Sequence, residues 1–202
     1  MAKFNYPDWS TIHHKHWQTI IDENINVKEK LTAIEVGCFE GRSTLWFADT
    51  LLQHKDSSLH CIDSWEGGEE VVRANLGFDM DRVAANFIHN IQQHPRSDQI
   101  SVWKTKSQKG LIDVCSLCYN EVDFIYLDGS HTQKDTLIDL VLALSLLKVG
   151  GIIIVDDYRN GMSTNNPLLR PKDAVDFVVK SYASDVSFFM TPEKQAVILR
   201  KN

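Results

Sequence analysis

The sequence predicts an α/β fold: a three-layer sandwich around a seven-stranded, mostly parallel sheet that ends in a C-terminal antiparallel hairpin. Two observations support this prediction. Short apolar runs rich in β-branched residues alternate with helical patterns along residues 31–155, as in successive βαβ units. Two further apolar runs near the C-terminus are separated by only five residues. The chain has no internal repeat and no low-complexity tract that would indicate another architecture.

The parallel part of the sheet is predicted from five runs. They lie at residues 31–37, 58–63, 100–104, 122–127 and 151–155. Helical patterns separate the runs, at residues 43–52, 79–92, 108–118 and 132–147. The last helix has the clearest pattern, because its apolar residues recur at spacings of three, four and seven: Leu137, Leu140, Val141, Leu144 and Leu147.

The C-terminal end departs from this alternation. Residues 173–180 predict a helix, and residues 186–190 and 196–200 predict two strands. The connection Thr-Pro-Glu-Lys-Gln is too short for a parallel crossover, so these two strands should form an antiparallel hairpin.

The domain organisation expected is one domain at residues 31–202, preceded by residues 1–30 as an N-terminal helical extension or lid. Trp9 and Trp17 in this extension fit two alternatives. They belong either to a lid over the substrate or to a helix packed on the edge of the sheet.

Composition excludes several partners. The chain has 202 residues with 21 Lys and Arg against 27 Asp and Glu, a net charge of −6, so it lacks the basic field of nonspecific nucleic-acid binding. The longest apolar run, residues 137–147, is far shorter than the ~20 residues that span a bilayer. No export signal is found at the N-terminus, and the four cysteines are expected to be reduced thiols in a cytoplasmic protein.

The first strand leads into a glycine-containing turn. Gly37 and Gly41 are separated by three residues in the segment Gly-Cys-Phe-Glu-Gly, and Ser43 follows at the start of a helix. Glycines allow a tight turn and the close approach of a ligand, and a helix N-terminus offers free N–H groups to an anion. Phe39 stands where dinucleotide-binding proteins have their middle glycine, which disfavours a nicotinamide oxidoreductase. The alternative is an ordinary strand-to-helix turn.

Polar residues also follow the second and third strands. Asp63 ends the second strand, where a carboxylate can accept hydrogen bonds from ribose hydroxyls. Ser107 and Gln108 follow the third strand, where the edge of an adenine ring can be recognised. Each could alone be a turn or cap residue, but open α/β sheets bind ligands at the carboxyl ends of successive strands.

Carboxylates cluster after the fourth and fifth strands. Asp128 follows the fourth strand, and Asp156 and Asp157 follow the fifth. Neighbouring strands lie ~4.8 Å apart, so the three carboxylates should converge and repel unless a proton or a cation neutralises them. Oxygen ligands favour a hard ion such as Mg²⁺. The alternative is that Asp128 caps the next helix and the Asp pair is a solvated part of a loop.

These motifs together resemble a known family. The segments Glu35-x-Gly37-x-x-x-Gly41-x-Ser43, Asp63, Ser107-Gln108, Asp128-x-x-His131 and Asp156-Asp157 look like the pattern of metal-dependent O-methyltransferases related to catechol O-methyltransferase. They also resemble a bacterial methyltransferase group with an Asp-Gly-Ser-His segment. The resemblance covers residues 31–158 and implies the Rossmann-like fold of class I S-adenosylmethionine (SAM)-dependent methyltransferases.

The resemblance implies roles for these residues. Glu35, Gly37, Gly41 and Ser43 would bind the methionine end of SAM, Asp63 the ribose, and Ser107 and Gln108 the adenine. Asp128, Asp156 and Asp157 would hold the divalent cation, most simply Mg²⁺, with Asp128 in the catalytic centre. His131 stands where the catechol enzymes have a lysine base, so it is a candidate base, a metal ligand or only a helix N-terminal residue.

The function expected is therefore SAM-dependent, metal-assisted O-methylation of a small hydroxylated molecule, without nucleic acid or membrane as partner. Whether the chain forms a homodimer is left open. The alternative is a noncatalytic module that binds SAM or a nucleotide and uses its loops to bind a partner protein.

Overall fold

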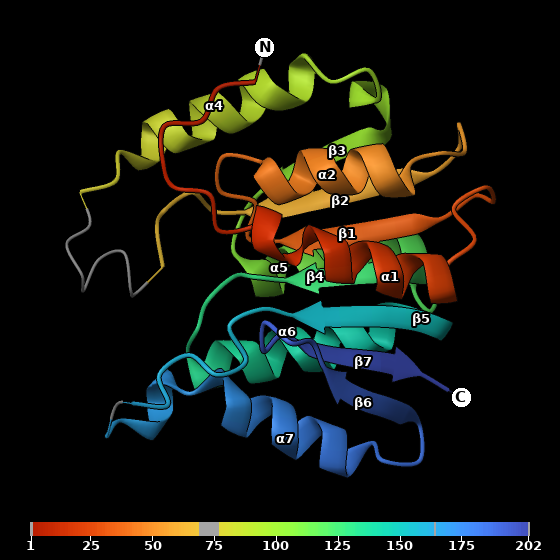
Figure 1. The fold of residues 1–202 in the computed structure, drawn as a ribbon, viewed down its shortest axis with the longest axis vertical. Coiled ribbons are helices and arrows are strands. Elements are labelled where there is room, and N and C mark those ends of the chain that lie inside the picture. The colour runs from red at the N-terminus through yellow and green to blue at the C-terminus, as the bar shows by residue number, and fades with distance from the viewer. Residues whose placement is uncertain (1, 69–76, 164, 202) are drawn as a thin grey trace.

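The computed structural model describes residues 2–68, 77–163 and 165–201. Its strands form one seven-stranded sheet in the order β3-β2-β1-β4-β5-β7-β6 (Figure 1). The pairs β1–β2, β2–β3, β1–β4 and β4–β5 are parallel, whereas β7 pairs antiparallel with both β5 and β6. The predicted fold class, including the C-terminal hairpin, is confirmed.

The strands have nearly the predicted boundaries. They are β1 (Thr32–Val36), β2 (Ser58–Asp63), β3 (Ile100–Lys104), β4 (Val122–Leu127), β5 (Leu147–Val155), β6 (Val186–Met190) and β7 (Ala196–Arg200). The largest difference is in β5, which begins at Leu147 rather than at Gly151. Gly150 has a φ of +81°, which a glycine adopts without strain, so the strand continues through this position. The two adjacent glycines are typical of a loop in sequence, which is why the start of the strand was predicted too late.

Helices cover both faces of the sheet (Figure 1). They are α1 (His14–Asn24), α2 (Arg42–Leu51), α4 (Met80–Gln92), α5 (Ser107–Cys118), α6 (Gln133–Leu146) and α7 (Pro171–Ser181). Three short 3₁₀ helices lie at Thr11–His13, Ser97–Gln99 and Pro167–Leu169. Side chains of α1, α2 and α4 share one buried cluster, and those of α5, α6 and α7 share the other.

The two clusters follow from the alternation of side chains along each strand. In β4, Ile125 and Leu127 face α5 and α6, whereas Phe124 and Tyr126 face α1 and α2. All six residues of β4 are buried, as expected for a central parallel strand covered on both faces.

The amphipathic pattern predicted for residues 132–147 is corrected in two places. Leu140 and Leu144 are buried, but Val141 is 42% exposed, and Leu147 belongs to β5. A periodic apolar stripe can be wider than the surface that the neighbouring helices cover, and α6 is covered by α5 and α7 only in part.

The N-terminal helix belongs to the same core as the sheet. Trp17 of α1 is fully buried, and its ring lies 4.9 Å from that of Phe47 and 5.0 Å from that of Tyr126. Trp9, which precedes the helix, is half exposed. Of the two alternatives for these tryptophans, Trp17 fits packing on the sheet. Whether residues 1–30 also act as a lid stays a prediction.

Two features of the fold bear on function. The order of the strands reverses about β1, because β2 and β3 lie on one side of it and β4 and β5 on the other, so the carboxyl ends of β1 and β4 form the topological switch point. Among the described residues, no helix is long and apolar enough to cross a membrane.

Candidate active site

The turn between β1 and α2 is closely packed against the end of β4. Gly37 and Gly41 have φ angles of +84° and +86°, which favour glycine. A Cβ atom added to Gly37 would lie 1.9 Å from the carbonyl oxygen of Asp128. The backbone of Asp128 also donates to the carbonyl of Val36 at 2.8 Å. The predicted cofactor turn and the predicted metal-binding strand end are therefore in direct contact.

Glu35 is buried beneath this turn. Its carboxylate accepts a hydrogen bond from the hydroxyl of Ser43 at 2.5 Å and another from the hydroxyl of Thr44. Burial raises the pKa of Glu35 to about 7, although the two hydroxyl donors oppose the rise. Glu35 and the Ser43 side chain thus bind each other and fix the start of α2, which leaves the backbone N–H groups of this helix end to meet a ligand.

Asp63 shapes the same turn from β2. Its Oδ2 atom accepts the backbone N–H groups of Cys38 at 2.8 Å and Phe39 at 3.0 Å. Its Oδ1 atom accepts the N–H of Trp65 at 2.7 Å. Burial raises the pKa of Asp63, and these N–H donors oppose the rise. A carboxylate oxygen can accept about two hydrogen bonds, so Oδ1 retains capacity for a further donor such as a ribose hydroxyl.

Ser107 and Gln108 begin α5, next to an acid that the sequence analysis treated only as an interruption of an apolar run. Asp139 of α6 is 4% exposed. Its burial raises the pKa of the carboxyl group to about 7, and hydrogen bonding by Ser107 and Gln108 lowers it in part. The two predicted adenine-binding residues therefore lie beside a buried carboxyl group on the neighbouring helix.

Three predicted site residues meet after β4 and β5. The Nε2 atom of His131 lies 3.1 Å from Oδ2 of Asp157 and 3.5 Å from Oδ1 of Asp128. One ligand atom from each residue lies within 4.8 Å of the other two. Asp157 has a φ of +49°, a left-handed conformation that is uncommon outside glycine.

Asp156 is oriented differently from Asp157. Its Oδ2 atom accepts the hydroxyl of Tyr126 at 2.8 Å, and its Oδ1 atom accepts the side-chain amide of Gln195 at 2.9 Å. It is not one of the three mutually close residues, and its role as a metal ligand stays a prediction.

The electrostatics of this cluster favour a bound cation. Burial raises the pKa of Asp128 well above its ordinary range, the neighbouring charge of Asp156 raises it further, and His131 opposes the rise. Burial and the adjacent carboxylates also raise the pKa of the Tyr126 phenol. Two carboxylate oxygens suit a hard divalent ion such as Mg²⁺ or Mn²⁺, whereas the imidazole nitrogen of His131 is a ligand for softer ions.

A second group of metal-binding side chains does not fit an ion as well. Glu35, Cys38 and Cys61 lie within reach of one another, but all three are buried and both oxygens of Glu35 are occupied by hydroxyl donors. Burial also raises the pKa values of both thiols, which disfavours the thiolates that bind metals.

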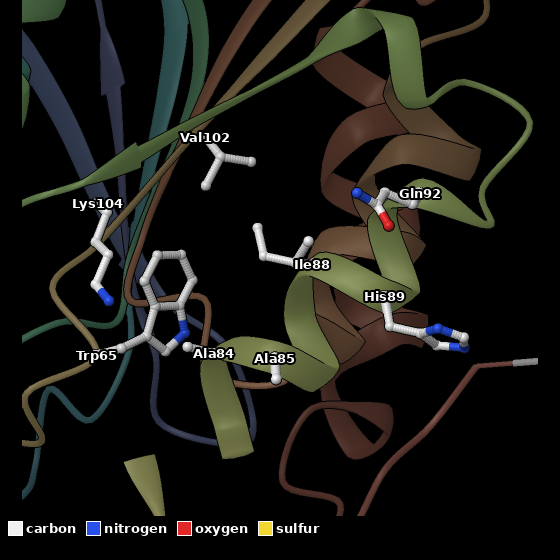
Figure 2. A pocket seen from close by; sticks show the side chains of 8 residues that line it. All are labelled: Trp65, Ala84, Ala85, Ile88, His89, Gln92, Val102 and Lys104. Atoms are coloured by element: carbon white, nitrogen blue, oxygen red, sulfur yellow. The ribbon is translucent and has the colours of Figure 1, made fainter. Parts of the chain in front are cut away.

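The described residues contain two hollows near these groups. A groove of about 400 Å³ lies between α4 and β3, where Ile88 and Val102 point toward each other and Trp65 closes one end (Figure 2). Trp65 is two residues from Asp63, so the groove adjoins the predicted ribose position. A much smaller cavity, of about 10 Å³, is lined by Ser130, His131 and Asp139 among others, and has room for about one water molecule.

Sequence reasoning missed Tyr126, Asp139 and Gln195. Tyr126 and Gln195 each contact Asp156, and Asp139 contacts the start of α5. The available signal was weak: a polar side chain inside an otherwise apolar strand or helix indicates a buried hydrogen-bond partner, but not which one.

The sheet order and the glycine turn at the switch point are those of the class I SAM-dependent methyltransferase fold. Residues 34–158 match the model of a methyltransferase domain family, and the chain belongs to that family. The predicted family resemblance and enzyme class are confirmed at this level.

Individual relatives are distant. An uncharacterized protein, R132 of Acanthamoeba polyphaga mimivirus, is 26% identical over 152 residues, which is 73% of this chain and 61% of that protein. The chain thus spans about three fifths of the length of this relative.

Solved structures share the fold. TomG from Streptomyces achromogenes, an O-methyltransferase of tomaymycin synthesis in complex with SAM, has a TM-score of 0.69 at 16% identity, covering 96% of this chain and 82% of that one. An O-methyltransferase from Bacillus cereus in complex with SAH has a TM-score of 0.66 at 20% identity, covering 95% and 81%.

Proposed function

We propose that the chain is a SAM-dependent O-methyltransferase that acts on a small hydroxylated molecule with the help of a divalent cation. The observation that supports this most directly is the contact between the glycine turn and the acidic strand end. Gly37 packs on the backbone of Asp128, so a methyl donor in the turn and a cation at the cluster would be neighbours. The O-methyltransferases among the similar structures support the same reaction, as do the SAM and SAH that two of them hold.

The cofactor would be bound by preformed groups. The N-terminal N–H groups of α2 are suited to the methionine carboxylate. Glu35 fixes the start of this helix by accepting hydrogen bonds from the hydroxyls of Ser43 and Thr44. Oδ1 of Asp63 would accept a ribose hydroxyl, and Ser107 and Gln108 would meet the adenine. The sulfonium of SAM supplies a methyl group that is already activated for transfer.

The acidic cluster would bind and orient the acceptor. Asp128, Asp157 and the predicted ligand Asp156 would hold the cation. When bound, a divalent cation lowers the pKa of a coordinated hydroxyl. The acceptor oxygen then forms a bond to the methyl carbon as the carbon–sulfur bond breaks, and the hydroxyl proton must pass to a base.

His131 is our candidate for this base. Its Nε2 atom faces both Asp128 and Asp157, which would stabilise the imidazolium formed when it accepts a proton. The same Nε2 atom would coordinate the cation if His131 were a metal ligand, so His131 cannot be a ligand and a base at the same time.

The proposal is tested by two binding measurements on the full chain. Calorimetry should show SAM binding without added metal, and electron paramagnetic resonance should show Mn²⁺ binding at the cluster. The double variant Asp128→Asn, Asp157→Asn should lose Mn²⁺ binding and keep SAM binding, whereas Asp113→Asn, a control on α5, should keep both.

Methyl transfer to a panel of vicinal diols and phenols, followed with labelled SAM, should then fall on addition of excess chelator. Full-rate methylation in chelator would refute metal assistance. Absence of SAM binding by the wild-type chain would refute the function itself.

A further inference from the structure

A buried hydrogen-bonded path connects the N-terminal helix to the acidic cluster. The indole N–H of Trp17 donates to Oε1 of Gln195 at 2.8 Å. The side-chain amide of Gln195 donates to Oδ1 of Asp156 at 2.9 Å. Trp17 is fully buried and Gln195 is 1% exposed, so water does not compete for the bond between them.

The direction of each bond in this path is fixed by chemistry. An indole N–H can only donate, so it requires the carbonyl oxygen of the Gln195 amide. The NH₂ group of Gln195 must then point the other way, toward Asp156, which accepts it. Trp17 therefore determines which end of the amide Asp156 meets.

Asp156 is held from both sides as a result. Gln195 donates to one carboxylate oxygen, and the Tyr126 hydroxyl donates to the other at 2.8 Å. The same hydroxyl lies 3.4 Å from Oδ2 of Asp128, so the two carboxylates are adjacent. Two donors hold Asp156 in one orientation, and each oxygen keeps capacity for a further contact.

Gln195 is itself rigidly placed. It ends the turn of the C-terminal hairpin, where its N–H donates to the hydroxyl of Thr191 at 3.1 Å and its carbonyl accepts the N–H of Thr191 at 3.0 Å. Trp17 is fixed by the surrounding rings of Trp46, Phe47 and Tyr126.

We propose that Trp17 and Gln195 are positioning residues that orient the Asp156 carboxylate for cation binding beside Asp128. This inference rests on the proposed function, and it extends the site to elements outside the family-matched residues 34–158. A buried amide among apolar neighbours gives little net stability compared with an apolar residue of the same size. The presence of the Gln195 amide at this buried position is explained if it orients the Asp156 carboxylate, as residues that hydrogen-bond to metal ligands do.

The test compares variants by Mn²⁺ affinity, measured by electron paramagnetic resonance without turnover. Gln195→Met keeps the side-chain length and removes the donor to Asp156. It should weaken Mn²⁺ binding by about 10–100-fold, the usual loss when an outer partner is removed. Trp17→Phe keeps an aromatic ring but removes the fixing N–H together with one ring of the indole, as Trp46→Phe also does for its ring, and it should show a smaller loss in the same direction.

The matched control is Trp46→Phe. The Trp46 ring lies 5.4 Å from that of Trp17 in the same aromatic cluster but is not part of the path. It should leave Mn²⁺ affinity within about twofold of wild type, a change of less than about 0.5 kcal/mol. All three variants should bind SAM as the wild type does.

The outcomes separate this inference from the proposed function. Wild-type Mn²⁺ affinity in both Gln195→Met and Trp17→Phe, or an equal loss in Trp46→Phe, would overturn the positioning role. So would a wild-type chain that binds SAM but no Mn²⁺. A wild-type chain that binds Mn²⁺ but no SAM would overturn the proposed function alone.

Discussion

The glycine turn and the acidic cluster are adjacent, but they are stabilised in opposite ways. In the turn, Glu35 and Asp63 each accept two or more hydrogen bonds from neighbouring residues, and those bonds define the backbone. In the cluster, burial and the charge of Asp156 both act against ionisation of Asp128, and the one opposing group is His131. The turn is complete without a ligand, whereas the cluster stores repulsion that a cation would relieve.

This difference predicts where stability and activity lie. Substitutions in the turn should lower the free energy of unfolding, because its polar groups are part of the fold. Substitutions in the cluster should lower activity and leave stability nearly unchanged, as expected for a site whose charges are kept for function. The predictions below test this division, from the largest loss to the smallest.

Gly37→Ala should have the largest effect. The added Cβ would overlap the backbone of Asp128 at 1.9 Å, and the φ of +84° is strained for alanine. We expect a loss of about 4 kcal/mol or more in the free energy of unfolding, measured by urea denaturation. The control is Gly150→Ala, with a φ of +81° but no atom within 4 Å, which should lose only about 1 kcal/mol. Equal losses in the two variants would contradict the close contact.

His131→Ala should break the cluster without breaking the fold. If His131 is the base, its removal should lower kcat by ~10²–10⁴, and the pH profile of the rate should lose its acidic limb. SAM affinity and the urea midpoint should stay close to wild type. A variant that keeps its rate and its pH profile would rule out the base, and loss of Mn²⁺ binding in the same variant would indicate a ligand instead.

Asp63→Ala should affect both cofactor binding and the turn. The expected loss is about 1–3 kcal/mol of SAM binding, or roughly tenfold or more in affinity, because ribose donors lose their acceptor. The variant also leaves the N–H groups of Cys38 and Phe39 without this acceptor, so the urea midpoint should fall as well. Calorimetry that shows unchanged affinity would contradict the assignment to ribose.

The fold was predictable because its signals are local. Strand period, helix period and the short connection at residues 191–195 each occur within one segment, and the strand-end rule then places Gly37, Asp63 and Asp128 at one edge. The start of β5 was missed because Gly150 and Gly151 resemble a loop in sequence, although the backbone there continues the strand.

The missing parts of the site depend on contacts between distant segments. Gln195 is 39 residues from Asp156 and 178 from Trp17. No spacing rule connects residues at such distances, and one glutamine in a hairpin turn looks like a solvated residue. The different partners of Asp156 and Asp157 are equally invisible in this adjacent pair, because Tyr126 and Gln195, which donate to Asp156, lie elsewhere in the chain.

Asp139→Asn should cause no loss of stability, and its effect depends on pH. The carboxyl group has a pKa of about 7 in the folded chain and about 4 when unfolded, so the folded state keeps a proton that the unfolded state has lost. The wild type is therefore destabilised progressively as the pH rises from about 4 to about 7, and fully above that. An asparagine cannot ionise, so the variant should match the wild type near pH 4 and be more stable at pH 8. We expect a gain of about 4 kcal/mol at pH 8, the free energy that corresponds to a carboxyl pKa of about 7 in the folded chain and about 4 when unfolded; the hydrogen bonds from Ser107 and Gln108 are already included in the folded value. Urea denaturation across this pH range provides the measurement, and a stability difference that does not change with pH would show that Asp139 does not titrate there.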